Sequence, residues 1–241
     1  MCTLSFIARR HGYVLGMNRD EQRARTAALP PAQHRLGSRE ALFPSELSGG
    51  TWIGVNDSGA TLALLNWYSV AVRVRTRSIS RGDIVRAALP SASATGVDAV
   101  LADSPLARVN PFRLFWASPA ERKVVEWRWN LVRLERIDHR WRTQIWSSSG
   151  FDEPGAQQTR TESFREALRQ SSAGSGEWLR RFHRGHRPQS GPYSVCMHRA
   201  DAVTVSFTEV TVTCSKAWMR YSPGAPCCTP AVHSLTLPLK R

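Results

Sequence analysis

The chain of 241 residues lacks the long apolar run that would mark a membrane protein. A spanning helix needs about 20 consecutive, mostly apolar residues, and no stretch approaches this. A secretory signal is not predicted either, since the short apolar stretch at the N-terminus precedes Arg9 and Arg10 whereas a signal begins with its basic residues. We therefore expect a cytoplasmic protein without a membrane span.

Lysine is scarce, although the formal net charge is +14. Lys123, Lys216 and Lys240 are the only lysines, so the positive charge comes almost entirely from arginine. The arginines are scattered along the chain, with the densest run at 180–187. Nucleic-acid binding needs basic side chains gathered on one face. We expect a dispersed basic surface and no specific nucleic-acid partner.

Metal-binding cysteine spacings are also missing. No C-x-x-C pair occurs, and the adjacent Cys227 and Cys228 are poorly placed to bind one ion together. Histidines such as His183 and His186 lack the spacing to cysteine or aspartate that would suggest a metal. The sequence predicts no metal site, no cofactor and no disulfide framework among its five cysteines, which are Cys2, Cys196, Cys214, Cys227 and Cys228.

Apolar residues, at 41% of the chain, suffice for one sizeable core. We expect a single domain over residues 1–222 and a loosely packed, proline-rich tail over 223–241. Residues 22–50, rich in proline, glycine and alanine, are predicted to form a long surface loop.

The remaining pattern is one of strand pairs and helices in alternation. This order favours an α+β sandwich over a doubly wound parallel sheet. Strands are predicted at 3–8, 13–16, 51–55, 60–65, 112–116, 124–127, 131–137, 193–198 and 202–212, and helices at 77–89, 96–101 and 161–169.

Cys2 stands out because it directly follows the initiator methionine. Methionine is readily removed before a small residue, which would leave a thiol and a free amine on one residue. The amine has an ordinary pKa of about 7.7–8.0 and the thiol about 8.5, so the amine can act as the base for its own side chain. Cys2 is therefore a candidate N-terminal nucleophile.

Three motifs of the first 70 residues bear a family resemblance. Met1-Cys-Thr3 begins the chain, Asn18-Arg-Asp-Glu21 follows the first predicted hairpin, and 49–56 reads G-G-T-W-I-G-V-N. Together, in this order and spacing, they resemble the NRDE family, also called the transport-and-Golgi-organisation family. The family is associated with secretory-pathway organisation, lipid homeostasis and haem handling.

The same stretch resembles the conjugated bile acid hydrolases and penicillin V acylases, which begin M-C-T and continue to a G-R-N-x-D box. The resemblance implies a four-layer α-β-β-α sandwich of the N-terminal-nucleophile-hydrolase type. It also implies roles for three residues: Cys2 as nucleophile, Asp20 orienting the amine, and Asn66 as an oxyanion donor.

The chain departs from that pattern at two places. Met17 stands where the box has arginine, and serine at Ser148 stands where a later element has asparagine. The candidate binding residues are Asn18 and Arg19 beside the box, Ser148, and Arg199 as a distal arginine. Adjacent strand residues point to opposite faces, so Arg19 has the alternative of facing away from the site.

Two functions follow. The first is hydrolysis of a small acyl-amide by Cys2. The alternative is a non-enzymatic protein that binds or carries haem, acyl-CoA or lipid, for which the missing box arginine and the serine at Ser148 are arguments. In both cases the partner is a small molecule, and the oligomeric state stays open.

Overall fold

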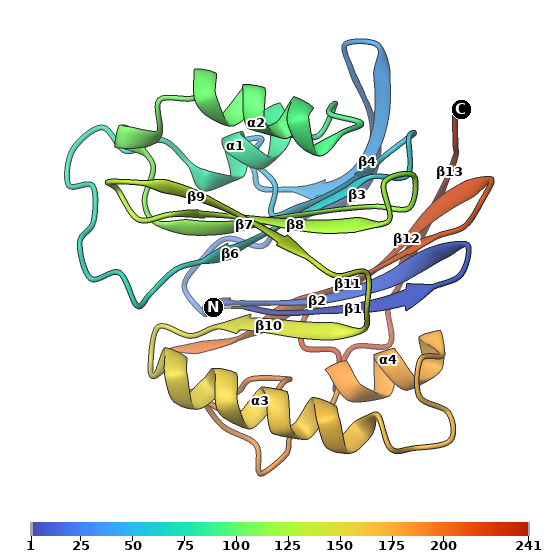
Figure 1. Cartoon of the computed structure of the whole chain (residues 1–241). Coiled ribbons are helices and arrows are strands. Elements are labelled where there is room, and N and C mark those ends of the chain that lie inside the picture. Colours follow the sequence, from blue (N-terminus) through green and yellow to red (C-terminus); the bar gives the residue numbers. More distant parts are fainter. Residues whose placement is uncertain (1, 241) are drawn as a thin grey trace.

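A computed structural model describes residues 2–240. Two antiparallel sheets stack face to face, with a pair of helices covering the outer face of each (Figure 1). The predicted α+β class and the four-layer α-β-β-α sandwich are thus confirmed. Within the described residues, no helix combines the length and apolar character needed to cross a bilayer.

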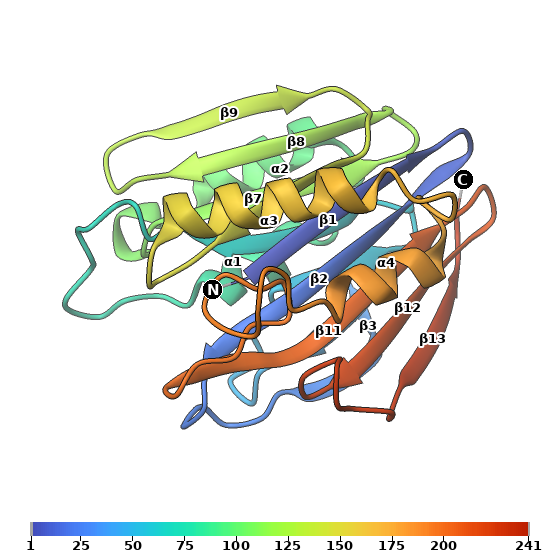
Figure 2. The same cartoon turned by 90° about the horizontal axis from the view of Figure 1, so that it is seen from below.

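The first sheet contains the β1–β2 hairpin that starts the chain. Its six strands run in the order β10-β1-β2-β11-β12-β13, and helices α3 and α4 cover its outer face (Figure 2). The bounds are β1 Cys2–Arg9, β2 Gly12–Gln22, β10 Gln144–Ser148, β11 Ala202–Val212, β12 Lys216–Pro223, β13 His233–Pro238, α3 Glu153–Ala167 and α4 Gly176–His183.

The second sheet has seven strands that follow one another in chain order, from β3 to β9. Helices α1 and α2 cover its outer face (Figure 1). The bounds are β3 Leu29–Leu36, β4 Arg39–Ser45, β5 Ile53–Asn56, β6 Thr61–Asn66, β7 Phe112–Ser118, β8 Lys123–Trp129, β9 Leu134–His139, α1 Arg81–Ala88 and α2 Ala94–Asp103, with a short 3₁₀ turn at Leu106–Arg108.

Alternation along β1 and β2 decides which side chains meet the other sheet. Leu4 and Phe6 of β1 and Leu15 and Met17 of β2 point into the core between the sheets, because residues two apart on a strand share a face. Thr3, Ser5 and Asn18 face the helix layer instead, where they meet polar groups rather than an apolar core. The ends of these two strands therefore carry different chemistry on their two faces.

The predicted loop at 22–50 is wrong over most of its length. Residues 29–45 form the hairpin β3–β4 at the edge of the seven-stranded sheet. The strand was missed because β3 is mostly exposed and contains Pro30 and Pro31. Proline is tolerated in an edge strand, where one side of the backbone has no strand partner.

The prediction of a loosely packed tail over 223–241 is wrong for residues 233–238, which form strand β13. Strand β13 pairs with β12 along its whole length, and Leu237 is fully buried in the core between the sheets. The prolines of the tail lie before β13 and at its last residue, Pro238. Residues 233–237 therefore keep the backbone N–H groups that a ladder needs.

The strand predicted at 193–198 is absent. This segment is irregular, and its backbone is bonded to several different elements: Cys196 N–H donates to Gly185 O and Met197 N–H to Thr204 Oγ1, at 3.0 and 2.8 Å. The apolar residues are buried, as expected of a strand, but scattered backbone and side-chain hydrogen bonds replace the ladder.

Candidate functional site

Four of the sequence-predicted residues converge on one cavity. Cys2, Arg19, Asp20 and Asn66 line a cavity of about 340 Å³ at the ends of β1, β2 and β6, closed on one side by the start of α1. A larger cavity, of about 540 Å³, lies beside α3 and α4 and contains none of the predicted site residues.

Cys2 is the first residue of β1 and lies between two neighbouring strands. It is opposite Ser148 of β10 and Arg19 of β2, and its side chain is 7% exposed. Burial raises the pKa of the thiol, and this is opposed by a backbone hydrogen bond from Asp20 and by the charge of Arg19. Burial therefore keeps the thiol protonated, and a thiolate needs a base beside it.

Arg19 faces the cavity, so the alternative that it points away is wrong. Residues directly opposite in an antiparallel pair share a face, and Arg19 lies opposite Cys2. It is also two residues beyond Met17, the position of the missing box arginine, and so on the same face as that residue. Its guanidinium carbon lies 4.3 Å from the centre of the Trp52 ring, and Nη2 donates to Glu46 Oε1 at 2.6 Å.

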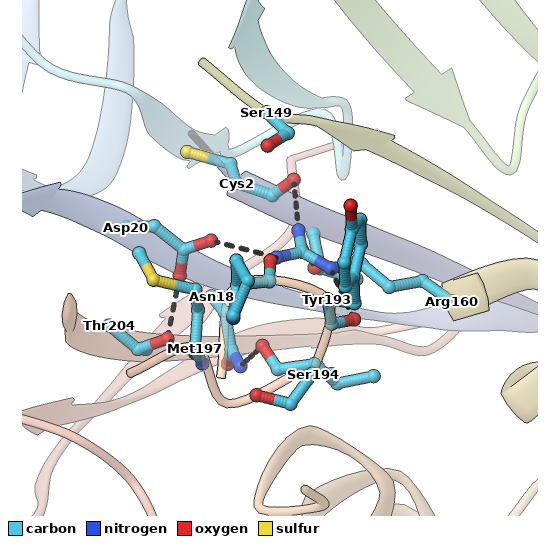
Figure 3. A network of polar contacts seen from close by, with 12 residues as sticks. Cys2, Asn18, Asp20, Ser149, Arg160, Tyr193, Ser194, Met197 and Thr204 are labelled. Carbon is cyan, nitrogen blue, oxygen red and sulfur yellow. Dashed lines mark hydrogen bonds and ion pairs between the residues drawn. The ribbon is translucent and has the colours of Figure 1, made fainter. Parts of the chain in front are cut away.

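The Asp20 carboxylate is buried and contacts both Thr204 and Arg160. Oδ1 accepts a hydrogen bond of 2.6 Å from Thr204 Oγ1, and Oδ2 lies 3.5 Å from Arg160 Nη2 (Figure 3). Contacts to both oxygens fix the position of the carboxylate. The backbone N–H of the same residue donates a hydrogen bond to the Cys2 sulfur.

Arg160 is a buried residue that the sequence did not single out. Its α3 side chain is fully buried, and Nη1 donates to Thr3 Oγ1 at 2.9 Å and to Cys2 O at 3.4 Å (Figure 3). With the ion pair to Asp20, this guanidinium joins the ends of β1 and β2. The helix prediction began at residue 161, and among so many arginines nothing in the pattern distinguished this one.

Asn18 lies on the other face of β2 and does not line the cavity. Its Nδ2 donates to His183 O at 2.9 Å and Val195 O at 2.8 Å, and it is fully buried. The amide thus holds the irregular segment 184–199 against the sheet, which is a supporting position behind the site.

Asn66 and Ser148 offer two further polar groups, Asn66 in the same cavity as Cys2 and Ser148 on the neighbouring strand β10. Asn66 lines the cavity, and its Nδ2 donates to Tyr68 OH at 3.0 Å. Ser148 is fully buried opposite Cys2, and within residues 2–240 its Oγ has no hydrogen-bond partner. A buried hydroxyl without a partner is costly, so Ser148 leaves a donor unused beside the sulfur.

Arg199 lies away from the cavity. Its Nη2 is 2.8 Å from Asp201 Oδ2, and its guanidinium carbon is 5.1 Å from the centre of the Phe151 ring. A different arginine, Arg81 at the start of α1, lines the cavity instead.

Arg81 has no carboxylate within ion-pair distance among the described residues. Its Nη1 donates to Pro111 O at 3.2 Å. Burial lowers the pKa of this guanidinium, although nearby groups that include Cys2 oppose the shift. It remains a cation at neutral pH and is available to an anionic group in the cavity.

The whole architecture resembles solved structures of one class. The chain superposes on penicillin V acylase from Agrobacterium tumefaciens with a TM-score of 0.56 and 10% identity, covering 98% of this chain and 86% of that one. It superposes on a C2A mutant of conjugated bile acid hydrolase from Clostridium perfringens with a TM-score of 0.55 and 9% identity, covering 100% and 97%. The fold is therefore that of the N-terminal-nucleophile hydrolases.

The sequence itself defines the family within this class. The profile of the family described as Transport and Golgi organisation 2 matches residues 1–185. The chain belongs to this family, as the three N-terminal motifs predicted. No curated protein sequence matches the chain.

Proposed function

We propose that this protein is an amide hydrolase with Cys2 as N-terminal nucleophile. The observation that carries the proposal is the position of Cys2 in the wall of a polar cavity, with the Asp20 backbone beside the sulfur and Asn66, from the other sheet, among the residues that line the same cavity. These groups supply the nucleophile, a donor that holds it, and a candidate oxyanion donor.

The reaction begins once Met1 is removed. The new amine of Cys2 takes the thiol proton, and the sulfur attacks the carbonyl carbon of the bound amide. The resulting oxyanion accepts a hydrogen bond from Asn66 Nδ2. The ammonium then gives its proton to the departing amine as the C–N bond breaks, which leaves a thioester on Cys2. Water attacks the thioester with the amine again as base, and the acid leaves with the thiol restored.

The cavity supports a small acyl-amide that carries an anionic group. Its volume of about 340 Å³ is at the small end of the range of about 300–1,000 Å³ found for ligand pockets. Arg19 and Arg25 are engaged with Glu46, whereas Arg81 has a charge to offer. A carboxylate on the substrate is the natural partner of such a guanidinium.

The alternative is a non-enzymatic carrier of haem, acyl-CoA or lipid. Arg81 favours it equally, since a propionate or phosphate would suit the same cation. The cavity's size and its many charged side chains argue against a large apolar body such as haem. Hydrolysis is therefore the better-supported function.

The test is a panel of N-acyl amino acids and penicillin V incubated with the wild type, Cys2→Ala and the matched control Cys214→Ala. Cys214 is an exposed thiol outside the cavity. Release of free amine by the wild type and the control, and none by Cys2→Ala, is the expected result. Activity that survives in Cys2→Ala would overturn the proposal, and saturable haem or acyl-CoA binding without turnover would support the carrier.

A further inference from the structure

We propose that His186, Cys196, His198 and Cys227 form a structural zinc site. Their four donor atoms, the imidazole nitrogens and the two sulfurs, all lie within 4.8 Å of one another. This inference does not depend on the chemistry of Cys2, and it replaces the expectation, drawn from sequence spacing alone, that the chain holds no metal.

Three distances, each from His198 Nε2 to one of the other donors, fit a tetrahedron around one ion. With Zn–N of about 2.0–2.1 Å and Zn–S of about 2.3 Å, tetrahedral geometry requires about 3.3 Å between two nitrogens and about 3.5 Å between nitrogen and sulfur. His186 Nε2 lies 3.2 Å from His198 Nε2, which is in turn 3.6 Å from Cys196 Sγ and 3.4 Å from Cys227 Sγ.

The donor set selects the metal. Two sulfurs with two imidazoles in a tetrahedron are a typical structural zinc set, whereas magnesium and calcium prefer oxygen ligands. Hydrogen bonding alone explains the cluster poorly. A hydrogen bond between His186 and His198 does not require the thiols of Cys196 and Cys227 to approach His198 Nε2 as well. The two cysteines are not joined as a disulfide.

The four ligands come from two segments that no ladder connects. His186, Cys196 and His198 belong to the irregular segment 184–199 between α4 and β11, and Cys227 lies between β12 and β13. An ion here would cross-link these segments. Four protein ligands leave no open position, which is the arrangement of a structural rather than a catalytic site.

The cross-link would also support Asp20. Met197, between two of the ligands, donates its N–H to Thr204 Oγ1 at 2.8 Å, and that hydroxyl donates to Asp20 Oδ1 at 2.6 Å (Figure 3). The same segment accepts from Arg160, through Pro192 O and Tyr193 O. Holding 184–199 in place therefore holds the partners of Asp20 in place.

Metal content by elemental mass spectrometry tests the site. We expect about one zinc ion per chain in the full-length protein purified without chelator. The loss should be at least tenfold in Cys196→Ser and Cys227→Ser. Two matched controls, Cys228→Ser and Cys214→Ser, should keep the metal, because Cys228 neighbours Cys227 but is outside the ligand set.

A measurement on the wild type removes any dependence on how the variants fold. After zinc is stripped and Co²⁺ added, a site with two thiolates gives sulfur-to-cobalt charge-transfer bands together with the intense visible bands of tetrahedral cobalt. Wild-type protein that takes up neither zinc nor cobalt, or zinc retained at full stoichiometry in Cys227→Ser, would overturn the proposal. Iron bound at the same four residues would overturn zinc as the metal.

Discussion

Arg160 and Asp20 form an ion pair in which both side chains are fully buried, with Nη2 and Oδ2 3.5 Å apart. The pair joins α3 to β2 directly behind Cys2. A buried pair contributes little net stability, but the loss of one partner removes a compensating charge from the other, which stays buried. The main effect of the pair is therefore to fix the position of Asp20.

The first prediction concerns that pair. Replacing Arg160 with Ala should lower the free energy of unfolding by about 3–5 kcal/mol, because the buried Asp20 carboxylate loses the guanidinium of its ion pair. Arg165→Ala is the matched control, since Arg165 lies on the exposed side of the same helix. Urea unfolding measures both, and equal, small losses would show that Asp20 does not need its partner.

The second prediction concerns the mature N-terminus. Met1 itself lies outside the described residues. The purified chain should lack Met1 and carry no internal cleavage, because the mechanism needs the free amine of Cys2. Intact-protein mass spectrometry decides this. Full retention of Met1 would rule out the amine as base.

The third prediction concerns the oxyanion donor. Asn66→Ala should lower turnover by roughly 100- to 1,000-fold if its amide binds the developing charge. Asn110→Ala is the control, because Asn110 lines the same cavity but its Oδ1 accepts from the Val74 N–H. Steady-state kinetics on the best substrate compares the two, and a similar fall in both would point to a general disturbance of the cavity.

The fourth prediction concerns pH and His183, which is fully buried and close to Ser5 Oγ and Asn18 Oδ1. Burial, with a smaller contribution from Arg160, lowers the pKa of His183 to about 3. The unfolded chain binds this proton below an ordinary pKa of about 6.5 and the folded chain does not. Stability is thus complete above that pH and falls as pH drops from about 6.5 toward 3.

His183→Gln should flatten this part of the stability curve, by up to about 1.4 kcal/mol per pH unit. His11→Gln, at an exposed turn, should leave the slope unchanged. Urea unfolding at a series of pH values measures both slopes. An unchanged slope in His183→Gln would show that this histidine is protonated in the folded chain as well.

The sequence by itself determined the fold class and the family, and it singled out Cys2 as the candidate nucleophile. These follow from local patterns: the alternation of β1, the apolar run of β6, and three motifs within the first 70 residues. Such patterns can be recognised without the structure, because each strand or helix buries its own apolar face, whichever element packs against it.

Only the tertiary structure decided which side chains meet. The face of Arg19 depends on its register opposite Cys2, and the importance of Arg160 on the packing of α3 behind β1 and β2. The four proposed metal ligands have irregular spacings, and folding brings Cys227 to His198 from 29 residues away. Contacts between distant segments are set by how sheets and helices pack, and no local periodicity encodes them.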